Sequence, residues 1–153
     1  MPVLIIPSNS VDMSLLGGGS TSLSPFKPVG VVQGTWTYGN GAGALQQQFY
    51  NATSADADEC YWYVLLSQGT YTFQKVGMKD TNLGITKWYL DAVLIATFDL
   101  YAAASTQWSI SEQTGIVVTS GKLFKLTVKI DGKNALSTNY KDFINGFQFI
   151  KTA

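Results

Sequence analysis

Hydrophobic and polar residues alternate along much of this chain with a period of two, which is the pattern of a half-buried β-strand. The alternation is clearest over 122–130, where Phe124, Leu126, Val128 and Ile130 fall on one side and lysine and threonine on the other. Short apolar runs bounded by turn residues predict strands at 30–38, 45–50, 59–66, 70–77, 84–91, 93–100, 106–113, 115–118, 122–131 and 143–151. Because no stretch keeps a helical period, the pattern predicts an all-β protein.

Residues 69–100 hold three consecutive runs of this kind and are predicted to form an antiparallel meander. Asp91 and Ala92 stand between two of the runs, at the place of a two-residue hairpin loop. Aspartate is usual there, whereas alanine tolerates a positive φ poorly. A hairpin is therefore predicted, with its turn type open.

About ten short strands in 153 residues favour a single antiparallel two-sheet sandwich, with a jelly roll as the preferred topology. The domain is predicted at 29–153, and its last run, 143–151, is predicted to pair centrally near the N-terminal strand. Residues 1–28 are predicted to form an extended N-terminal arm.

The arm differs in composition from the domain, since it contains all four prolines and a Gly-Gly-Gly-Ser run at 17–20. It is too apolar for an ordinary solvated tail and too short for a core of its own. We expect its apolar side chains to dock on a neighbouring subunit, with 17–20 as a hinge; a flexible leader is the alternative. These side chains are Val3, Leu4, Ile5, Ile6, Met13, Leu15, Leu16, Leu23 and Phe26.

Charge and composition exclude several classes of function. Only 13% of the residues are charged, the formal net charge is zero, and the chain has neither histidine nor arginine. No field attracts nucleic acid or an anionic membrane, and the commonest general base and the bidentate phosphate clamp are missing. Paired carboxylates of the glycosidase kind remain possible chemistry, but no motif selects a pair. We expect no enzyme, no cofactor, and a structural role for the single Cys60.

Three carboxylates, Asp56, Asp58 and Glu59, lie close together in the sequence and are weak candidates for binding Ca²⁺. The spacing lacks the glycine and the later glutamate of an EF-hand. We therefore expect no metal, and a carboxylate that caps the turn before the strand at 59–66.

Aromatic residues are abundant and could stack on the C–H faces of sugar rings. The candidates for a glycan-binding or subunit-contact surface are Tyr61, Trp62, Tyr63, Trp88 and Trp108. Tyr61 and Tyr63 share a strand face opposite Trp62, so one of these two sets must be core. A purely structural role as strand formers and core residues is the alternative.

No targeting segment is evident. The apolar residues 3–6 stop at Pro7 without a preceding basic region, and no apolar run approaches the roughly 18 residues of a membrane span. We expect synthesis in the cytoplasm and export only as part of a larger assembly.

Several short motifs carry a resemblance to a known family. The chain resembles the small jelly-roll structural proteins of tailed bacteriophages. The resemblance lies in residues 9–17, 54–58, 69–72, 84–85 with 89–91, 98–101 (Phe-Asp-Leu-Tyr) and 130–134 (Ile-Asp-Gly-Lys-Asn). The domain of that family is similar to galactose-binding-like and carbohydrate-binding-module sandwiches. Ala92 departs from the usual Asp-Gly turn.

The resemblance implies a non-enzymatic virion protein on the particle surface. The expected role is a homotrimeric capsid decoration or cement protein that contacts the major capsid protein or another virion protein, without nucleic acid or membrane. The alternative is a carbohydrate-binding module, or a head-fibre or tail adhesin, that recognises host surface glycans. The arm distinguishes the two, since a free-standing sugar module has no need of it.

Overall fold

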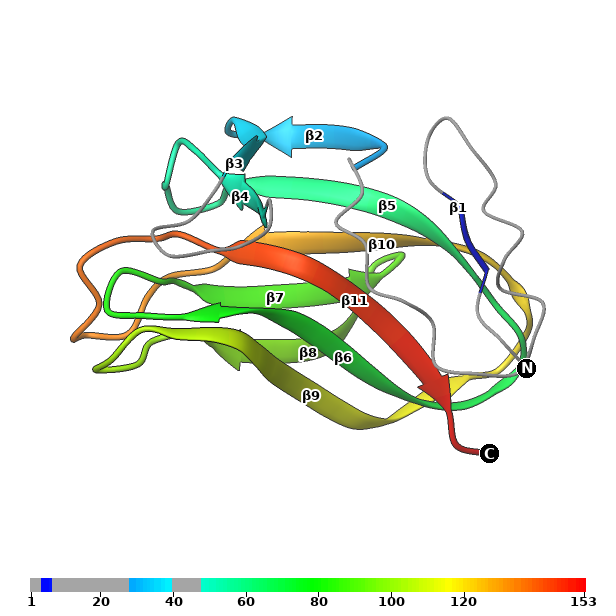
Figure 1. The fold of residues 1–153 in the computed structure, drawn as a ribbon. Helices are drawn as coiled ribbons and strands as arrows, with labels where there is room; N and C mark the ends of the chain where they lie inside the picture. Colours follow the sequence, from blue (N-terminus) through cyan, green and yellow to red (C-terminus); the bar gives the residue numbers. More distant parts are fainter. Residues whose placement is uncertain (1–3, 7–27, 40–47) are drawn as a thin grey trace.

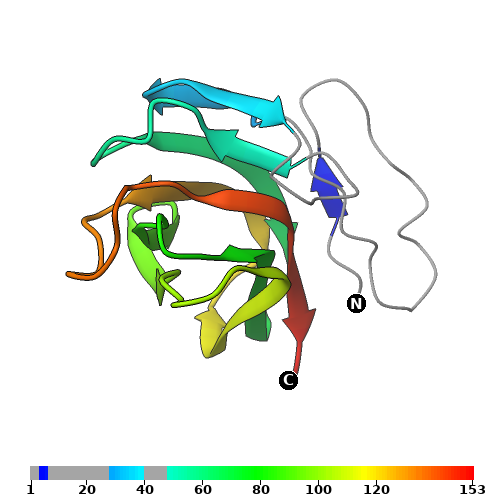
Figure 2. The same ribbon diagram turned by 60° about the vertical axis from the view of Figure 1, so that its left-hand side comes forward.

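The protein is a sandwich of two antiparallel β-sheets, as the alternation predicted (Figures 1 and 2). A computed structural model describes residues 4–6, 28–39 and 48–153. These residues form strands, turns and loops, and none of them lies in a helix. A helix able to cross a membrane is accordingly not found in the described ranges.

The first sheet, called sheet A, is built around β5 (Glu59–Leu66) and β10 (Lys122–Ile130). Its order is β1-β5-β10-β7-β8, with β1 at Leu4–Ile6, β7 at Ile85–Leu90 and β8 at Val93–Asp99. β2 (Gly30–Gln33) also pairs with β5. β1 lies opposite residues 63–65 of β5 and β2 opposite residues 59–61, so two short segments share one edge of this strand.

The second sheet, sheet B, has the order β3-β4-β11-β6-β9. Its strands are β3 (Trp36–Gly39), β4 (Gln48–Asn51), β11 (Phe143–Lys151), β6 (Gly69–Lys79) and β9 (Thr106–Val118). The last strand, β11, lies between β4 and β6, which confirms the predicted central position. The first strand of the domain, β2, pairs with β5 in the other sheet and does not neighbour β11. The strand β9 forms an edge of the sheet.

Aromatic side chains fill the space between the sheets. Trp62 of sheet A stacks on Trp88, with ring centroids 6.2 Å apart, and Phe147 of sheet B meets the Trp62 ring edge-on at 5.1 Å. Phe73 lies 5.0 Å from Trp88 and 4.9 Å from Phe149. The two sheets therefore share one continuous aromatic core, and each fully buried aromatic side chain contributes about 1.5–3 kcal/mol through the hydrophobic effect.

The predicted meander over 69–100 is wrong. β6 belongs to sheet B, where it pairs with β9 and β11, whereas β7 and β8 form a hairpin in sheet A. The polar turn at 79–82 carries the chain from one sheet to the other, and strand alternation alone does not distinguish such a crossing from a hairpin.

The predicted hairpin at Asp91 is confirmed, since Leu90 pairs with Val93. Asp91 has φ +53° and Ala92 keeps a negative φ. A positive φ at the first central residue alone is the pattern of a type II′ turn. Aspartate tolerates this conformation better than alanine does, which explains the order of the two residues.

Three other predictions about the strands are changed by local features of the backbone. The strand predicted at 30–38 is divided at Gly34, which has φ +82°. The runs at 106–113 and 115–118 join into the single strand β9. In β11 a bulge between Ile144 and Gly146 shifts the alternation, so that Phe143 stacks on Tyr50 instead of sharing a face with Phe147.

Candidate functional site

The outer face of sheet B presents a row of side chains on the edge strand β9. Trp108 and Ile110 are 48% and 58% exposed, and Glu112 follows two residues later on the same face. The intervening Ser111 is buried and pairs with Lys75 on the inner side. At about 3.4 Å per residue the row from Trp108 to Glu112 extends about 13 Å.

Trp108 has an unusual backbone conformation. Its φ is +58°, in the left-handed region that a bulky side chain rarely adopts. The residue belongs to a register irregularity, because Gly77 pairs with Ser109 while Lys79 pairs with Thr106. Gln107 and Trp108 therefore stand together opposite Met78, which is a β-bulge. Strained residues of this kind concentrate at binding sites, where the strain holds a side chain in a required position.

Two amides and a carboxylate lie beside this row. Gln74 of β6 donates from Nε2 to Oε2 of Glu112 at 2.5 Å, and Gln148 of β11 donates from Nε2 to Oε1 of Gln74 at 2.6 Å. Register places Gln74 opposite both Glu112 and Gln148. Three neighbouring strands thus bring hydrogen-bonding groups to one line across the sheet.

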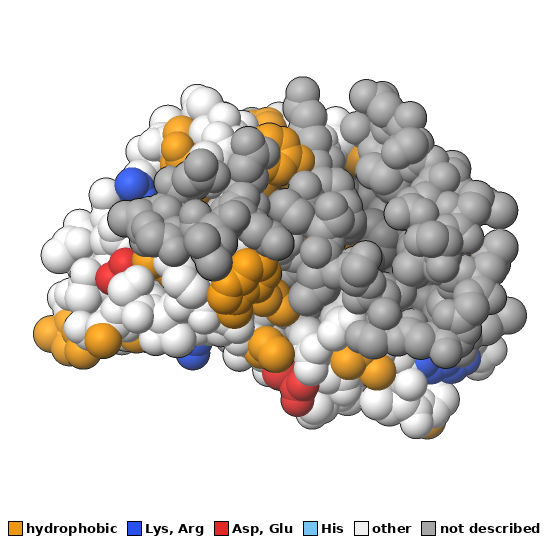
Figure 3. All heavy atoms as spheres, in the orientation of Figure 1, with side chains coloured by type: hydrophobic (Ala, Val, Ile, Leu, Met, Phe, Trp, Pro, Cys, Tyr) orange, Lys and Arg blue, Asp and Glu red, His pale blue; other side chains and the backbone are white. Residues whose placement is uncertain are grey.

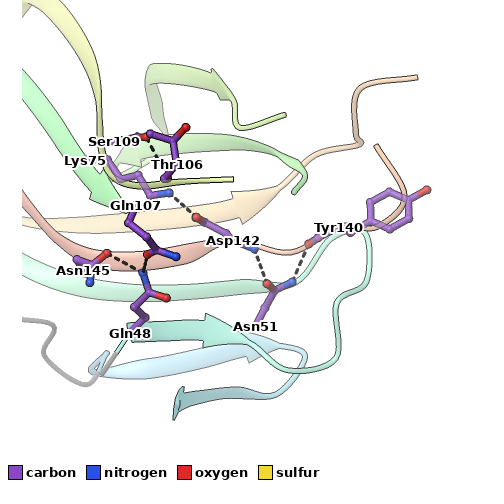
Figure 4. Close-up of polar contacts among 9 residues, drawn as sticks. All are labelled: Gln48, Asn51, Lys75, Thr106, Gln107, Ser109, Tyr140, Asp142 and Asn145. Carbon is purple, nitrogen blue, oxygen red and sulfur yellow. Dashed lines mark hydrogen bonds and ion pairs between the residues drawn. The ribbon is translucent and has the colours of Figure 1, made fainter. Parts of the chain in front are cut away.

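A second cluster of side-chain amides, Gln48, Asn145 and Gln107, holds the β-bulge in place through hydrogen bonds (Figure 4). Nε2 of Gln48, which is buried, donates to Oδ1 of Asn145 at 2.9 Å and to Oε1 of Gln107 at 3.2 Å. Nε2 of Gln107 lies 3.5 Å from Sδ of Met78. Because Gln107 directly precedes Trp108, these contacts fix the bulge that turns the tryptophan outward.

We define the outer row as Trp108, Ile110 and Glu112 together with Gln74 and Gln148. An aromatic ring and an aliphatic side chain provide an apolar contact, and the amides and carboxylate provide donors and acceptors for hydroxyl groups. In Figure 3, which shows sheet B from its outer face, hydrophobic side chains are exposed beside an acidic one where β9 lies. This combination can contact a small polar ring through an apolar surface and through hydrogen bonds.

The five predicted aromatic candidates lie in three different places: the core, the outer face of sheet A and the outer face of sheet B. Trp62 and Trp88 are 1% and 0% exposed, so the prediction that they could contact a glycan or a subunit is wrong: they are core. Tyr61 and Tyr63 lie on the outer face of sheet A, with their rings edge-on at 5.8 Å. Lys125 places its Nζ over the Tyr61 ring at 4.2 Å, so this ring face is already occupied. Of the five, Trp108 alone is open on sheet B.

The carboxylates proposed for Ca²⁺ do not converge. Asp58 is buried and accepts hydrogen bonds from Nδ2 of Asn51 at 2.8 Å and from the Ala55 amide at 3.0 Å. Asp56 accepts from the Gly132 amide at 2.8 Å, on another segment. Among the described residues, no three histidine, cysteine, aspartate or glutamate side chains come together to hold a metal ion, and Glu59 therefore belongs to no such group. Asp58 caps the turn before β5, in agreement with the expectation that one of these carboxylates would do so.

Most of the arm lies outside the described residues, including Val3, Met13, Leu15, Leu16, Leu23, Phe26 and the predicted hinge at 17–20. Leu4, Ile5 and Ile6 form β1, which pairs antiparallel with Tyr63–Leu65 of β5. The arm thus adds a strand to an edge of the domain.

A hollow of about 430 Å³ lies between β2 and β3. Its lining is mainly apolar and consists of Pro28, Val29, Gly30, Val31, Trp36, Thr37, Tyr38 and Phe49. Burial raises the pKa of the Tyr38 hydroxyl. The described residues that line it contribute the hydroxyl groups of Thr37 and Tyr38 but no side-chain amide or carboxylate, unlike the outer row.

Sequence analysis did not find Gln74, Gln107, Ile110, Glu112 or Gln148. The one available signal was local: Trp108, Ile110 and Glu112 alternate with Ser109 and Ser111, which indicates an outward row. The glutamines come from strands distant in sequence, and their meeting depends on register.

Comparisons with models of protein families and with curated proteins found no match. Solved structures are similar in fold. A xanthan lyase from Paenibacillus matches with a TM-score of 0.67 and 22% identity over 82% of this chain, but the chain spans only 12% of the lyase. A family 6 carbohydrate-binding module from Clostridium cellulolyticum, solved with xylose, matches with a TM-score of 0.61 and 15% identity, covering 84% of this chain and 95% of the module. The chain therefore has the β-sandwich fold found in a carbohydrate-binding module.

Proposed function

We propose that this protein is a non-catalytic carbohydrate-binding module whose ligand lies on the outer row. The observation that carries the proposal is Trp108, an exposed tryptophan held in a left-handed conformation beside a line of amides. The module-like fold supports it, since a family 6 module with the same architecture was solved with xylose. This was the alternative drawn from the sequence; the proposed site keeps Trp108 from the predicted aromatic candidates and adds four residues that were not predicted from the sequence.

The chemistry of the row favours a neutral glycan. Trp108 and Ile110 would pack on the C–H face of a pyranose ring, while Gln74 and Gln148 would donate to and accept from its hydroxyl groups. Glu112 carries a negative charge there and would repel an acidic sugar. A row of about 13 Å fits a short segment of a polysaccharide better than a single sugar.

A titration of neutral polysaccharides and their oligosaccharides against the full chain, measured by calorimetry, tests this proposal. Trp108→Ala should weaken binding about tenfold or more, the effect of about 1.4 kcal/mol. Val117→Ala is the matched control, because Val117 is another exposed apolar residue of β9 and lies outside the row. Equal affinities of Trp108→Ala and the unchanged protein would refute the site.

A second proposed function is the virion role: a trimeric decoration protein on a phage particle, bound to a major capsid protein. One observation favours it: β1 of the arm occupies an edge of β5, and strand addition of this kind also joins separate chains. Light scattering of the full chain and of a chain starting at Val29 tests it. A mass three times the 16.6 kDa chain, lost on truncation, would support an arm-dependent trimer; a monomer in both would count against it.

A further inference from the structure

The interior of the sandwich contains a lysine and an aspartate in direct contact (Figure 4). Lys75 lies on β6, Asp142 directly precedes β11, and the Lys75 Nζ atom contacts Oδ1 of Asp142. The two side chains are 1% and 0% exposed. The outer row does not use this pair, which lies on the other side of sheet B.

As an ion pair, this contact is poorly compensated. Removing two charges from water costs several kcal/mol per ion, and the attraction repays this only when the remaining polar atoms are also paired. Oδ2 of Asp142 has no hydrogen-bond partner among the described residues. A neutral product that kept the contact and removed both charges would relieve this cost.

The surroundings hold the two groups together. Oδ1 of Asn51 accepts the Asp142 amide hydrogen at 2.8 Å, and Nδ2 of Asn51 donates to the Tyr140 carbonyl at 2.9 Å. On the lysine side, a Cβ at Gly77 would come within 2.9 Å of Nζ and would also collide with the Phe143 carbonyl oxygen. Glycine at 77 therefore leaves the space in which the end of Lys75 lies.

We propose that Lys75 and Asp142 are joined by an intramolecular amide bond that the folded protein forms by itself. The bond can form once one proton has moved from Nζ to the carboxylate, which turns the ammonium into a nucleophilic amine and removes both charges from the interior. The neutral amine then attacks the carboxyl carbon and forms the carbon–nitrogen bond. The nitrogen gives up one of its two hydrogens as a proton to the hydroxyl group, whose carbon–oxygen bond breaks, and one water molecule leaves. Ammonium and carboxylate become amide and water, so atoms and charge balance without an oxidant or a co-reactant.

Close positioning in a site without water is what makes such a condensation feasible. Oriented intramolecular reactions reach effective molarities of about 10⁵–10⁸ M, and exclusion of water removes the solvent that keeps the ions apart. Asn51 and Gly77 act as positioning residues, since neither exchanges atoms with the new bond.

Two exposed ion pairs in the same chain are internal controls. Lys122 and Asp91 lie 2.7 Å apart, and Lys87 and Asp131 lie 2.5 Å apart, but water reaches both pairs. Their charges stay solvated, so neither pair should condense. Comparing these exposed pairs with Lys75 and Asp142 shows whether contact is sufficient for the amide bond to form or whether burial is also required.

The first test is the intact mass of the purified full chain, measured under denaturing conditions. The expected mass is lower than that of the sequence by one water molecule. Digestion with a protease that cleaves after aromatic residues should then give one branched peptide that joins 74–88 to 141–143, and its fragmentation should place the link between Lys75 and Asp142. Lys87 lies on the same peptide 74–88 and should be unmodified, while Asp91, Lys122 and Asp131 should lie on separate linear peptides.

Lys75→Arg provides the matched variant, because it keeps the positive charge and removes the amine nucleophile. Its mass should equal the value calculated from its sequence.

The proposal is overturned if the unchanged protein has its full sequence mass. It is also overturned if the lost water maps to a succinimide at Asp131-Gly132 while the Lys75 and Asp142 peptides stay separate. The mass of the unchanged protein shows whether one water molecule has been lost, so the proposal can be tested even if the variant does not fold.

Discussion

Trp62 and Trp88 stack on each other at the centre of the sandwich, with centroids 6.2 Å apart and ring planes 15° from parallel. Both were candidates for a surface that contacts sugar, and both are almost completely buried. Their indoles face Phe147 of the opposite sheet, at 5.1 Å and 5.9 Å. Two of the four tryptophans of the chain therefore hold the sheets together.

The first prediction concerns this stack. Trp88→Ala should lower the free energy of unfolding by about 3–5 kcal/mol, because it leaves a large cavity between the sheets. Trp88→Phe should lower it less, since Nε1 of Trp88 has no hydrogen-bond partner among the described residues and phenylalanine loses only volume. Urea denaturation measures both. A Trp88→Ala variant as stable as the unchanged protein would contradict the described core.

The second prediction separates the backbone of Trp108 from its ring. Trp108→Gly and Trp108→Ala both remove the indole, but only alanine keeps a Cβ at φ +58°. The glycine variant should be more stable than the alanine variant by about 1 kcal/mol, because glycine adopts a left-handed conformation without steric cost. Thermal denaturation of the two proteins gives the difference. Equal stabilities would show that the bulge at Trp108 relaxes when the ring is lost.

The third prediction concerns Cys60. Burial raises the pKa of its thiol well above the ordinary value. In the native state the thiol should resist a disulfide reagent at pH 8 and react once the protein is unfolded. Rapid reaction of the native protein would place Cys60 outside the core.

The same shift predicts a pH dependence. The folded thiol keeps its proton at pH values where the unfolded thiol loses it, so the native state binds more protons and stability falls as the pH rises above about 8.5. Cys60→Ala should flatten this part of the stability profile while the contributions of lysine and tyrosine remain. Identical profiles for the two proteins would contradict the raised pKa.

The fourth prediction concerns the turn at Asp91. The pKa of its carboxyl group is lowered, first by the hydrogen bond from Lys122 and then by the backbone amide of Lys125. The unfolded state therefore binds the proton more readily, and this contribution to stability is lost as the pH falls below the ordinary aspartate value of about 3.9. An NMR titration should give a midpoint below that value. Lys122→Met should move it upward, and an unchanged midpoint would exclude the contact.

Alternation along the chain determined much of the fold. It placed ten strands with few errors, identified the apolar side of 122–130, and located the hairpin at Asp91, because burial of one sheet face imposes a period of two on the sequence. The same local chemistry gave the capping role of Asp58 in place of a metal ligand. The composition, with no histidine or arginine, limited the reactions open to the chain.

The tertiary structure decided what alternation leaves open. A period of two gives every strand two faces but does not say which one meets the other sheet, so Trp62 and Trp88 could not be distinguished from Trp108 in advance. Gln74, Glu112 and Gln148 meet through register, and Lys75 reaches Asp142 across 67 positions of the chain. These contacts depend on the pairing of distant strands and the packing of two sheets, which are properties of the whole chain and not of any local stretch.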